Sequence, residues 1–161
     1  MGRELAVLWA GRHQRSHWEE ICDSYRQRIA RLARATPVRD VPIRARAAAD
    51  DPQRLRAEGQ ALLAAVPPSA WTFALDSRGE SLSSEQLAER LARLRQEWPH
   101  PIVFLIGSDL GLDRAVIDSA RAVLSLGPMT LSHELARVVL YEQLYRALSI
   151  EAGMSYHREP L

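Results

Sequence analysis

The chain has 161 residues, of which 47% are apolar, so it falls within the size of one domain and can build a conventional core. Its single cysteine, Cys22, excludes an internal disulfide and a cysteine-based zinc site, and the net charge of +1 excludes a strongly basic protein. No apolar run reaches the roughly 20 residues that span a bilayer, and residues 1–10 show no signal-peptide pattern, so a cytoplasmic protein is expected.

The first part of the chain predicts alternating strands and helices. An apolar run ended by Gly11 is typical of a buried strand, and Ser16 can cap a helix with apolar residues at helical spacing. Pro37 and Pro42 restrict the next strand to a sheet edge or an irregular segment. Pro52 occupies a favoured first-turn position of a second helix. The predicted elements are a strand at 4–10, a helix at 16–33, a strand at 38–43 and a helix at 51–66.

The second part continues the alternation, which predicts an α/β fold with a parallel sheet. Ser83 and Gln86 form a capping box at the start of one helix. The predicted elements are a strand at 71–75, a loop at 76–79, a helix at 83–98, a strand at 101–106, a short helix at 113–120, a strand at 122–126, a helix at 133–150 and an exposed tail at 151–161.

An arginine patch follows from the uneven distribution of charge. Residues 1–60 hold 12 Arg against 8 acidic residues, whereas residues 61–161 hold 9 Arg against 12, and lysine is absent throughout. Guanidinium groups suit bidentate phosphate contacts, so an RNA-facing surface is one interpretation, and a solvated helix surface in an Arg-rich chain is the other. Offset only by Asp40, the patch comprises Arg26, Arg28, Arg31, Arg34, Arg39, Arg44 and Arg46.

Three predicted loops follow strand ends and qualify as a ligand site. Ligands of open parallel sheets bind at the carboxyl ends of the strands, which places the loops after Leu75, Ile106 and Leu126 together. The turn at 107–111 resembles a nucleotide-binding turn because glycine permits close backbone approach. It matches neither G-x-G-x-x-G nor a P-loop, so an ordinary tight turn is the alternative.

The sequences around these loops resemble a known family. Residues 74–76, 104–111, 124–146 and 156–159 closely resemble the RlmH family (ribosomal RNA large subunit methyltransferase H), which are small SPOUT methyltransferases. The resemblance covers essentially the whole chain and is strongest from Trp71 to Glu159. Two positions depart from the family: Ser108 replaces a glycine, which is expected to narrow the turn, and Ser132 replaces a proline, where it is expected to cap the closing helix.

The resemblance implies a single SPOUT (α/β knot) domain with a deep trefoil knot near the C-terminus, an exception to the rule that chains avoid knots. It also implies that S-adenosyl-L-methionine is cradled by the three loops, and it implies no metal. The residues that it assigns to the cofactor are Leu75, Gly107, Leu126, Gly127, Pro128, Met129, Thr130 and Leu131.

The reaction implied is methylation at N3 of a pseudouridine in the 23S rRNA of the assembled ribosome. His133 and Arg137 are one helical turn apart, so they can present a base or an anion-stabilising pair, although His133 can equally be a plain first-turn residue. The C-terminal tail combines a stacking ring, a titratable group and a phosphate ligand. The candidate catalytic residues are His133, Arg137, Tyr156, His157 and Arg158.

The resemblance further implies a homodimer that pairs through the knot region, in which one tail joins the partner's site. Tyr141, Tyr145 and Leu148 form a stripe that suits either the dimer interface or the monomer core. Glu142 and Arg146, four residues apart, predict a surface ion pair. Other functions considered are a non-catalytic ribosome-binding homologue, a SPOUT methyltransferase acting on another RNA such as a tRNA, and a flavodoxin-like small-molecule binder.

Overall fold

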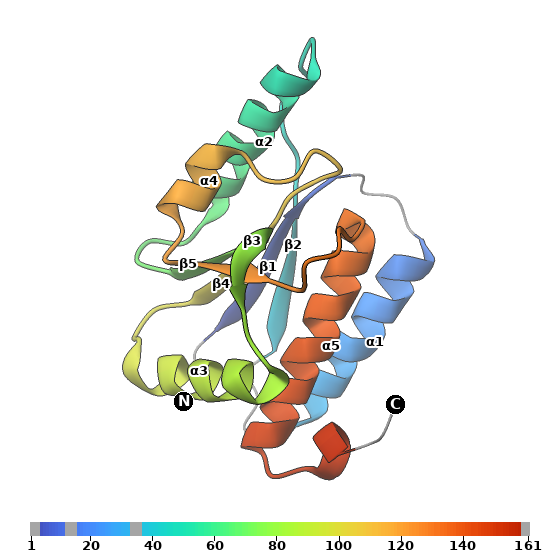
Figure 1. Ribbon diagram of the computed structural model, residues 1–161, viewed down its shortest axis with the longest axis vertical. Coiled ribbons are helices and arrows are strands. Elements are labelled where there is room, and N and C mark those ends of the chain that lie inside the picture. The colour runs from blue at the N-terminus through green and yellow to red at the C-terminus, as the bar shows by residue number, and fades with distance from the viewer. Residues whose placement is uncertain (1–3, 12–15, 33–36, 159–161) are drawn as a thin grey trace.

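The structure, a computed structural model, describes residues 4–11, 16–32 and 37–158 (Figure 1). For residues 157 and 158 it describes the backbone but not the side chains. Strands and helices alternate as the sequence predicted. The elements are β1 (Leu5–Ala10), α1 (His17–Arg31), β2 (Val38–Ile43), α2 (Asp51–Ala65), β3 (Trp71–Ser81), α3 (Ser84–Glu97), β4 (Ile102–Ile106), α4 (Arg114–Ser119), β5 (Ala122–Ser125), α5 (His133–Glu151) and the 3-10 helix η1 (Ser155–Arg158).

Five parallel strands form one sheet in the order β2-β1-β4-β3-β5, which confirms the predicted α/β class. The inner strands β1 and β4 are buried along their whole length, and both are almost entirely apolar because helices cover both of their faces. Strand β2 lies at an edge of the sheet. Pro42 has no backbone N–H to donate, and an edge strand tolerates this because it has no neighbouring strand on its outer side. The trefoil knot stays a prediction.

Helices α1, α3 and α5 cover one face of the sheet, and α2 and α4 cover the other (Figure 1). The core between the sheet and helices α1, α3 and α5 is larger than the core on the other face. In it the rings of Phe73 and Phe104 stack, with their centres 4.9 Å apart. Tyr141, Tyr145 and Leu148 lie inside this core with exposed fractions of 0%, 9% and 3%. Of the two interpretations of that stripe, the monomer core is therefore the correct one, and these residues are not available to an interface.

The structure corrects the predicted loop at 76–79. Strand β3 continues to Ser81, and its register on β5 shifts so that Leu75 and Glu80 both lie opposite Leu124. The intervening residues bulge out of the ladder, and a Cβ on Gly79 would lie 2.5 Å from the carbonyl oxygen of Val123. Polar composition indicated a loop, but backbone pairing across a bulge depends on the neighbouring strand, which composition does not report.

The predicted exposed tail is confirmed for residues 151–155, whereas Tyr156 is half-buried. Helix α5 ends at Glu151, and after a short turn the chain forms η1, from which Tyr156 packs back on α5. Among the described residues no helix is long and apolar enough to cross a membrane. In the same part of the chain, no three His, Cys, Asp or Glu side chains are grouped to hold a metal ion.

Cys22 offers a direct test of the packing of α1 on the sheet. Its side chain is fully buried, and burial raises the pKa of its thiol to about 11. At pH 8 the native thiol is therefore protonated and enclosed, so we expect no reaction with a thiol reagent such as Ellman's reagent until denaturant is added, after which one thiol per chain reacts. Rapid labelling of the native protein would contradict the position of α1.

Candidate functional site

A cavity of about 190 Å³ lies between the bulge of β3, the turn after β4 and the loop after β5, and we call it the strand-end cavity. Six of the eight residues predicted to bind a cofactor line it, namely Leu75, Leu126, Gly127, Met129, Thr130 and Leu131. Gly107 is buried and Pro128 is exposed, and neither lines the cavity. Sequence reasoning missed Asp76, Ser77, Gly111, Leu112 and Ala136, which complete the lining.

Gly107 shapes the turn that forms part of the cavity wall. A Cβ at this position would lie 2.2 Å from the carbonyl oxygen of Gly111, so only glycine lets the turn after β4 fold back on itself. The Gly111 N–H donates to the Ser108 carbonyl at 2.9 Å, and Gly111 has a φ of +78°. This closed turn delivers Gly111 and Leu112 to the cavity wall, which explains how Gly107 contributes without lining it.

The β5–α5 loop (residues 126–132) is fastened to β3 by one hydroxyl. The Ser125 Oγ accepts from the Gly127 N–H at 3.1 Å and faces the Ser77 and Gly127 carbonyl oxygens at 3.1 and 3.0 Å. Gly127 has a φ of +133°, and no atom lies within 4 Å of where its Cβ would be. The loop therefore presents bare backbone to open space beside the cavity.

Asp76 lies on the cavity wall and carries a charge. The Arg78 guanidinium donates two hydrogen bonds to its carboxylate, at 2.9 and 3.0 Å, and these hold the pKa of Asp76 below its usual value. Asp76 and Leu112 also line an adjoining hollow of about 520 Å³ that reaches α4. The two spaces together form a cleft with an ionised carboxylate where they meet.

The two departures from the family pattern have different outcomes. The Ser132 Oγ accepts from the Leu135 N–H at 3.2 Å, which confirms the predicted helix cap. Ser108 does not narrow the strand-end cavity, because it does not line it. Its buried hydroxyl instead donates to Glu58 at 2.6 Å, and Arg54 bridges to Asp109 beside it. Ser108 thus ties the turn to α2.

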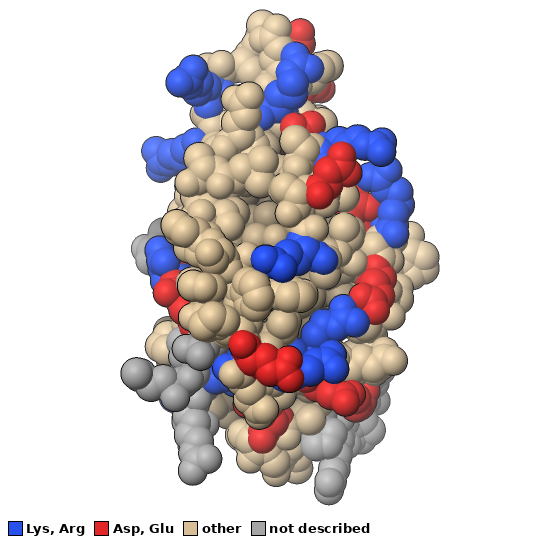
Figure 2. All heavy atoms as spheres, turned by 90° about the vertical axis from the view of Figure 1, so that its left-hand side faces the viewer, with Lys and Arg blue, Asp and Glu red and all other residues tan. Residues whose placement is uncertain are grey.

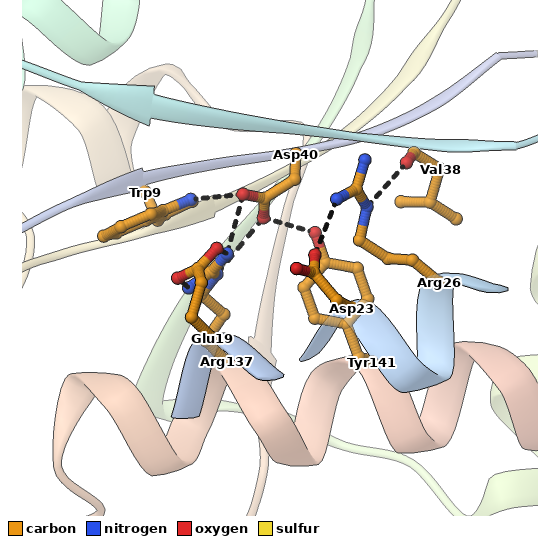
Figure 3. A network of polar contacts seen from close by, with 8 residues as sticks. All are labelled: Trp9, Glu19, Asp23, Arg26, Val38, Asp40, Arg137 and Tyr141. Carbon is orange, nitrogen blue, oxygen red and sulfur yellow. Dashed lines mark hydrogen bonds and ion pairs between the residues drawn. The ribbon is translucent and has the colours of Figure 1, made fainter. Parts of the chain in front are cut away.

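Arg137 lies in a buried polar network that joins α5 to α1 and β2 (Figure 3). Its guanidinium donates to Glu19 at 2.7 and 2.9 Å and to Asp40 at 2.6 and 3.1 Å. Asp40 also accepts from the Trp9 indole and from the Tyr141 hydroxyl. The Arg137 Cζ lies 4.0 Å from the centre of the Trp9 ring. We call these five side chains the Arg137 network.

These contacts engage the guanidinium that was predicted to present, with His133, a base or an anion-stabilising pair to a substrate. Four of its five N–H donors are taken, and its side chain is only 5% exposed. Burial lowers its pKa, but the bonds to Glu19 and Asp40 outweigh burial and raise it above its ordinary value. The guanidinium is therefore charged and paired in this structure, and its bonds hold α5 to α1 and β2.

His133 begins α5 and lines a second cavity, of about 140 Å³. Its ring packs against the backbone of Gly11, where a Cβ would lie 3.0 Å from two ring atoms and where φ is +128°. The His133 Nε2 is buried without a hydrogen-bond partner among the described residues. We call this cavity the tryptophan pocket, and its lining comprises Trp9, Ala10, Ser16, Trp18, Glu19, Ile106, His133, Glu134 and Arg137.

Tyr156 lies far from His133 within one chain. Its ring packs on Tyr145 at 4.6 Å, and its hydroxyl donates to Glu142 at 3.2 Å. Burial raises the pKa of Tyr156 to about 12. Tyr145 follows His133 by twelve residues, or about 18 Å along the helix axis. The predicted Glu142–Arg146 pair is present at 2.6 Å, but it is half-buried under Tyr156 rather than free on the surface.

The described part of the arginine patch is partly neutralised. Arg26 pairs with Asp23 and Arg39 with Glu4, whereas Asp40, the expected counter-charge, is buried in the Arg137 network. Arg34 lies outside the described residues, as do the side chains of His157 and Arg158. Figure 2 shows another side of the molecule, where side chains of both signs are scattered over a largely uncharged surface and a basic side chain lies near its centre. No continuous basic surface is visible on that side.

Comparison with known proteins decides the family. A model described as "Predicted SPOUT methyltransferase" matches residues 4–157. The chain belongs to the SPOUT methyltransferase family. It is 41% identical over 155 residues to the ribosomal RNA large subunit methyltransferase H of Solidesulfovibrio magneticus, covering 96% of this chain and 99% of the relative. The protein of that name from Nitrobacter winogradskyi is 38% identical over 157 residues, covering 96% and 98%. These relatives confirm the resemblance to the RlmH family.

Two solved structures share the overall fold of this chain. A probable methyltransferase from Bordetella pertussis superposes with a TM-score of 0.53 at 18% identity, over 90% of this chain and 96% of that one. A probable methylase family protein from Haemophilus influenzae gives 0.55 at 13% identity, over 100% and 72%. At these identities the likeness concerns the fold alone.

The Arg137 network is expected to stabilise this SPOUT methyltransferase strongly. Asp40→Ala leaves a buried guanidinium short of a partner, so we expect it to lower the free energy of unfolding by about 3 kcal/mol or more, measured by urea denaturation. Asp118→Ala is the matched control, because Asp118 is 66% exposed and faces Arg114 at 3.6 Å. That variant is expected to change stability by about 1 kcal/mol or less. Equal effects would contradict a stabilising role for the network.

Proposed function

We propose that this protein methylates N3 of a pseudouridine in the 23S rRNA of the assembled ribosome, in the cytoplasm, with S-adenosyl-L-methionine as methyl donor. The observation that carries the proposal is the strand-end cavity, built from β3, the turn after β4 and the loop after β5 of a chain similar over its whole length to ribosomal RNA large subunit methyltransferase H proteins. The family supports the transfer of a methyl group, and the names of the relatives support ribosomal RNA as the acceptor.

The residues present fit such a cofactor. Leu75, Leu126 and Leu131 give the strand-end cavity apolar walls for an adenine ring, and the bare backbone at Gly127 offers main-chain donors and acceptors for its edge. The adjoining hollow leaves room for the remainder of the molecule, and the ionised Asp76 lies at the junction, where it can pair with an amino or hydroxyl group. When bound, S-adenosyl-L-methionine supplies an electrophilic methyl group.

The protein's own contribution is mainly placement. N3 of the base must lie in line with the methyl group at a reacting distance of about 3–3.5 Å, and holding both partners supplies much of the rate. Arg137 serves this purpose indirectly, because it fixes the helix that carries Ala136 to one cavity and His133 to the other. We propose that His133, Tyr156, His157 and Arg158 contact the RNA.

We further propose that the working site needs two copies of the chain. Tyr156 packs on the C-terminal half of α5, whereas the strand-end cavity and His133 lie at its N-terminal end. A tail can therefore join a cavity most simply when a second copy supplies it. A homodimer also brings more arginine to the RNA than a chain with a net charge of +1 offers alone.

The deciding experiment incubates the protein with isotopically labelled S-adenosyl-L-methionine and ribosomes that lack the modification, and then maps the label by mass spectrometry. We expect one methyl group at N3 of a pseudouridine in 23S rRNA. Methylation of free tRNA but not of ribosomes would overturn the substrate. Binding of ribosomes without any methyl transfer would identify a non-catalytic homologue.

Filling the strand-end cavity should abolish cofactor binding. Ala136 lies on its wall, so Ala136→Leu places three extra carbons where the ligand must lie, and we expect affinity measured by calorimetry to fall by tenfold or more. Ala152→Leu is the matched control, because Ala152 is exposed just after α5. The control variant is expected to bind S-adenosyl-L-methionine with the affinity of the parent protein. Unchanged binding by Ala136→Leu would instead indicate that the cofactor binds elsewhere.

Mixing two inactive variants tests the shared site. His133→Ala and Arg158→Ala are each expected to lose at least tenfold in methylation rate. If one chain supplies His133 and its partner supplies Arg158, a mixed dimer has one site with both defects and one intact site. Random exchange should then restore about a quarter of the parental activity. A mixture that stays inactive, or a monomer by light scattering, would contradict the shared site.

A further inference from the structure

The size and the lining of the tryptophan pocket suit a flat ring. The side chains of Trp9 and Trp18 line it together with Ile106, so aromatic and apolar surfaces make up much of its wall. The position of Trp9 is fixed, because its indole donates to Asp40 and Arg137 lies over its ring. A volume of about 140 Å³ is well below the 300–1,000 Å³ of pockets for larger ligands, so the pocket suits a single ring system.

The polar groups in the pocket include hydrogen-bond acceptors. Within the described part of the chain the His133 Nε2 has no hydrogen-bond partner, and it lies 3.9 Å from a carboxylate oxygen of Glu134, which also lines the pocket. The Glu134 carboxylate accepts hydrogen bonds and an imidazole nitrogen can accept one, so this pair of groups suits a ligand that presents N–H groups on one edge. A buried nitrogen without a partner is costly, which favours a ligand that supplies the missing bond.

The charges in the pocket disfavour an anion. The cation of Arg137 is already balanced by Glu19 and Asp40, and Glu134 adds a further negative charge. A phosphate group would therefore meet carboxylates, and the lining that the structure describes holds no free cation for it. A neutral nucleobase fits both the charges and the aromatic walls, because RNA-binding proteins stack unpaired bases on aromatic side chains and read their edges with polar groups.

We infer that the tryptophan pocket binds an unstacked pyrimidine base of the RNA substrate, a base other than the one that is methylated. The inference rests on the proposed function, which supplies the RNA. The accepting base must reach the methyl group, yet none of the described residues lines both the strand-end cavity and the tryptophan pocket. A base in the pocket therefore anchors the RNA beside the reaction and contributes to the choice of substrate.

Indole resonances provide a direct test in the intact protein. The four tryptophans give four indole N–H signals, and two of them, Trp71 and Trp98, pack on each other away from the pocket. With uridine 5′-monophosphate at about 10 mM, where a complex with a Kd of that size is half formed, we expect the Trp9 and Trp18 signals to shift and the others to stay. Ribose 5-phosphate, which lacks the base, is expected to shift neither.

Two outcomes of this titration would overturn the inference: no shift of the Trp18 signal, or equal shifts with ribose 5-phosphate, which would indicate an anion site. A parallel titration with S-adenosylhomocysteine reports on the proposed function alone, because it should move the Gly127 amide signal in the strand-end cavity. If only the response to uridine 5′-monophosphate is missing, the inference about the base pocket fails. If only the response to S-adenosylhomocysteine is missing, the proposed cofactor site fails.

Kinetics on ribosomes test the role assigned to the base. Trp18→Ala removes one stacking surface, so we expect KM for ribosomes to rise about tenfold with kcat within about twofold of the parent value. Trp98→Ala is the matched control, since Trp98 is equally half-buried but lies at the other end of the strands, and both constants should stay unchanged. A fall in kcat at constant KM would assign the pocket to the accepting base and overturn the inference.

Discussion

A buried arginine paired with two carboxylates fixes the geometry on which both cavities depend. Arg137, Glu19 and Asp40 come from α5, α1 and β2, so their bonds join three elements that are distant in the sequence (Figure 3). Charges are removed from water at a high cost unless each finds a partner, and this requirement leaves α5 few alternative positions. Because α5 carries residues of both cavities, a shift of this helix would change both.

Close backbone approach performs the corresponding task on the other side of the strand-end cavity. Gly107 lets the turn after β4 fold on itself, and Gly79 lets β3 bulge against β5, since a Cβ at either position would collide with a carbonyl oxygen. The Ser125 hydroxyl then fastens the β5–α5 loop to the bulge. The cavity is thus enclosed by backbone segments that only small residues allow to meet.

Most of the element boundaries were predictable because they depend on local chemistry. Apolar runs located the buried strands, and the caps at Ser83 and Ser132 located two helix starts, each confirmed by its hydrogen bonds. The bulge of β3 and the packing of Tyr156 were not predictable, because each depends on a partner far along the chain. The same reason explains why the pairing of Arg137 with Glu19 and Asp40 was not predicted from the sequence.

The sequence by itself determined the α/β class, the three segments that converge and, through its resemblance, the family. These follow from periodicity, capping and motif strings, which are properties of neighbouring residues. Only the tertiary structure decided which residues line the strand-end cavity, that Ser108 bonds to α2, and that the tryptophan pocket exists. Cavities and buried ion pairs arise between elements, so their composition is fixed by packing across the chain rather than by any one segment.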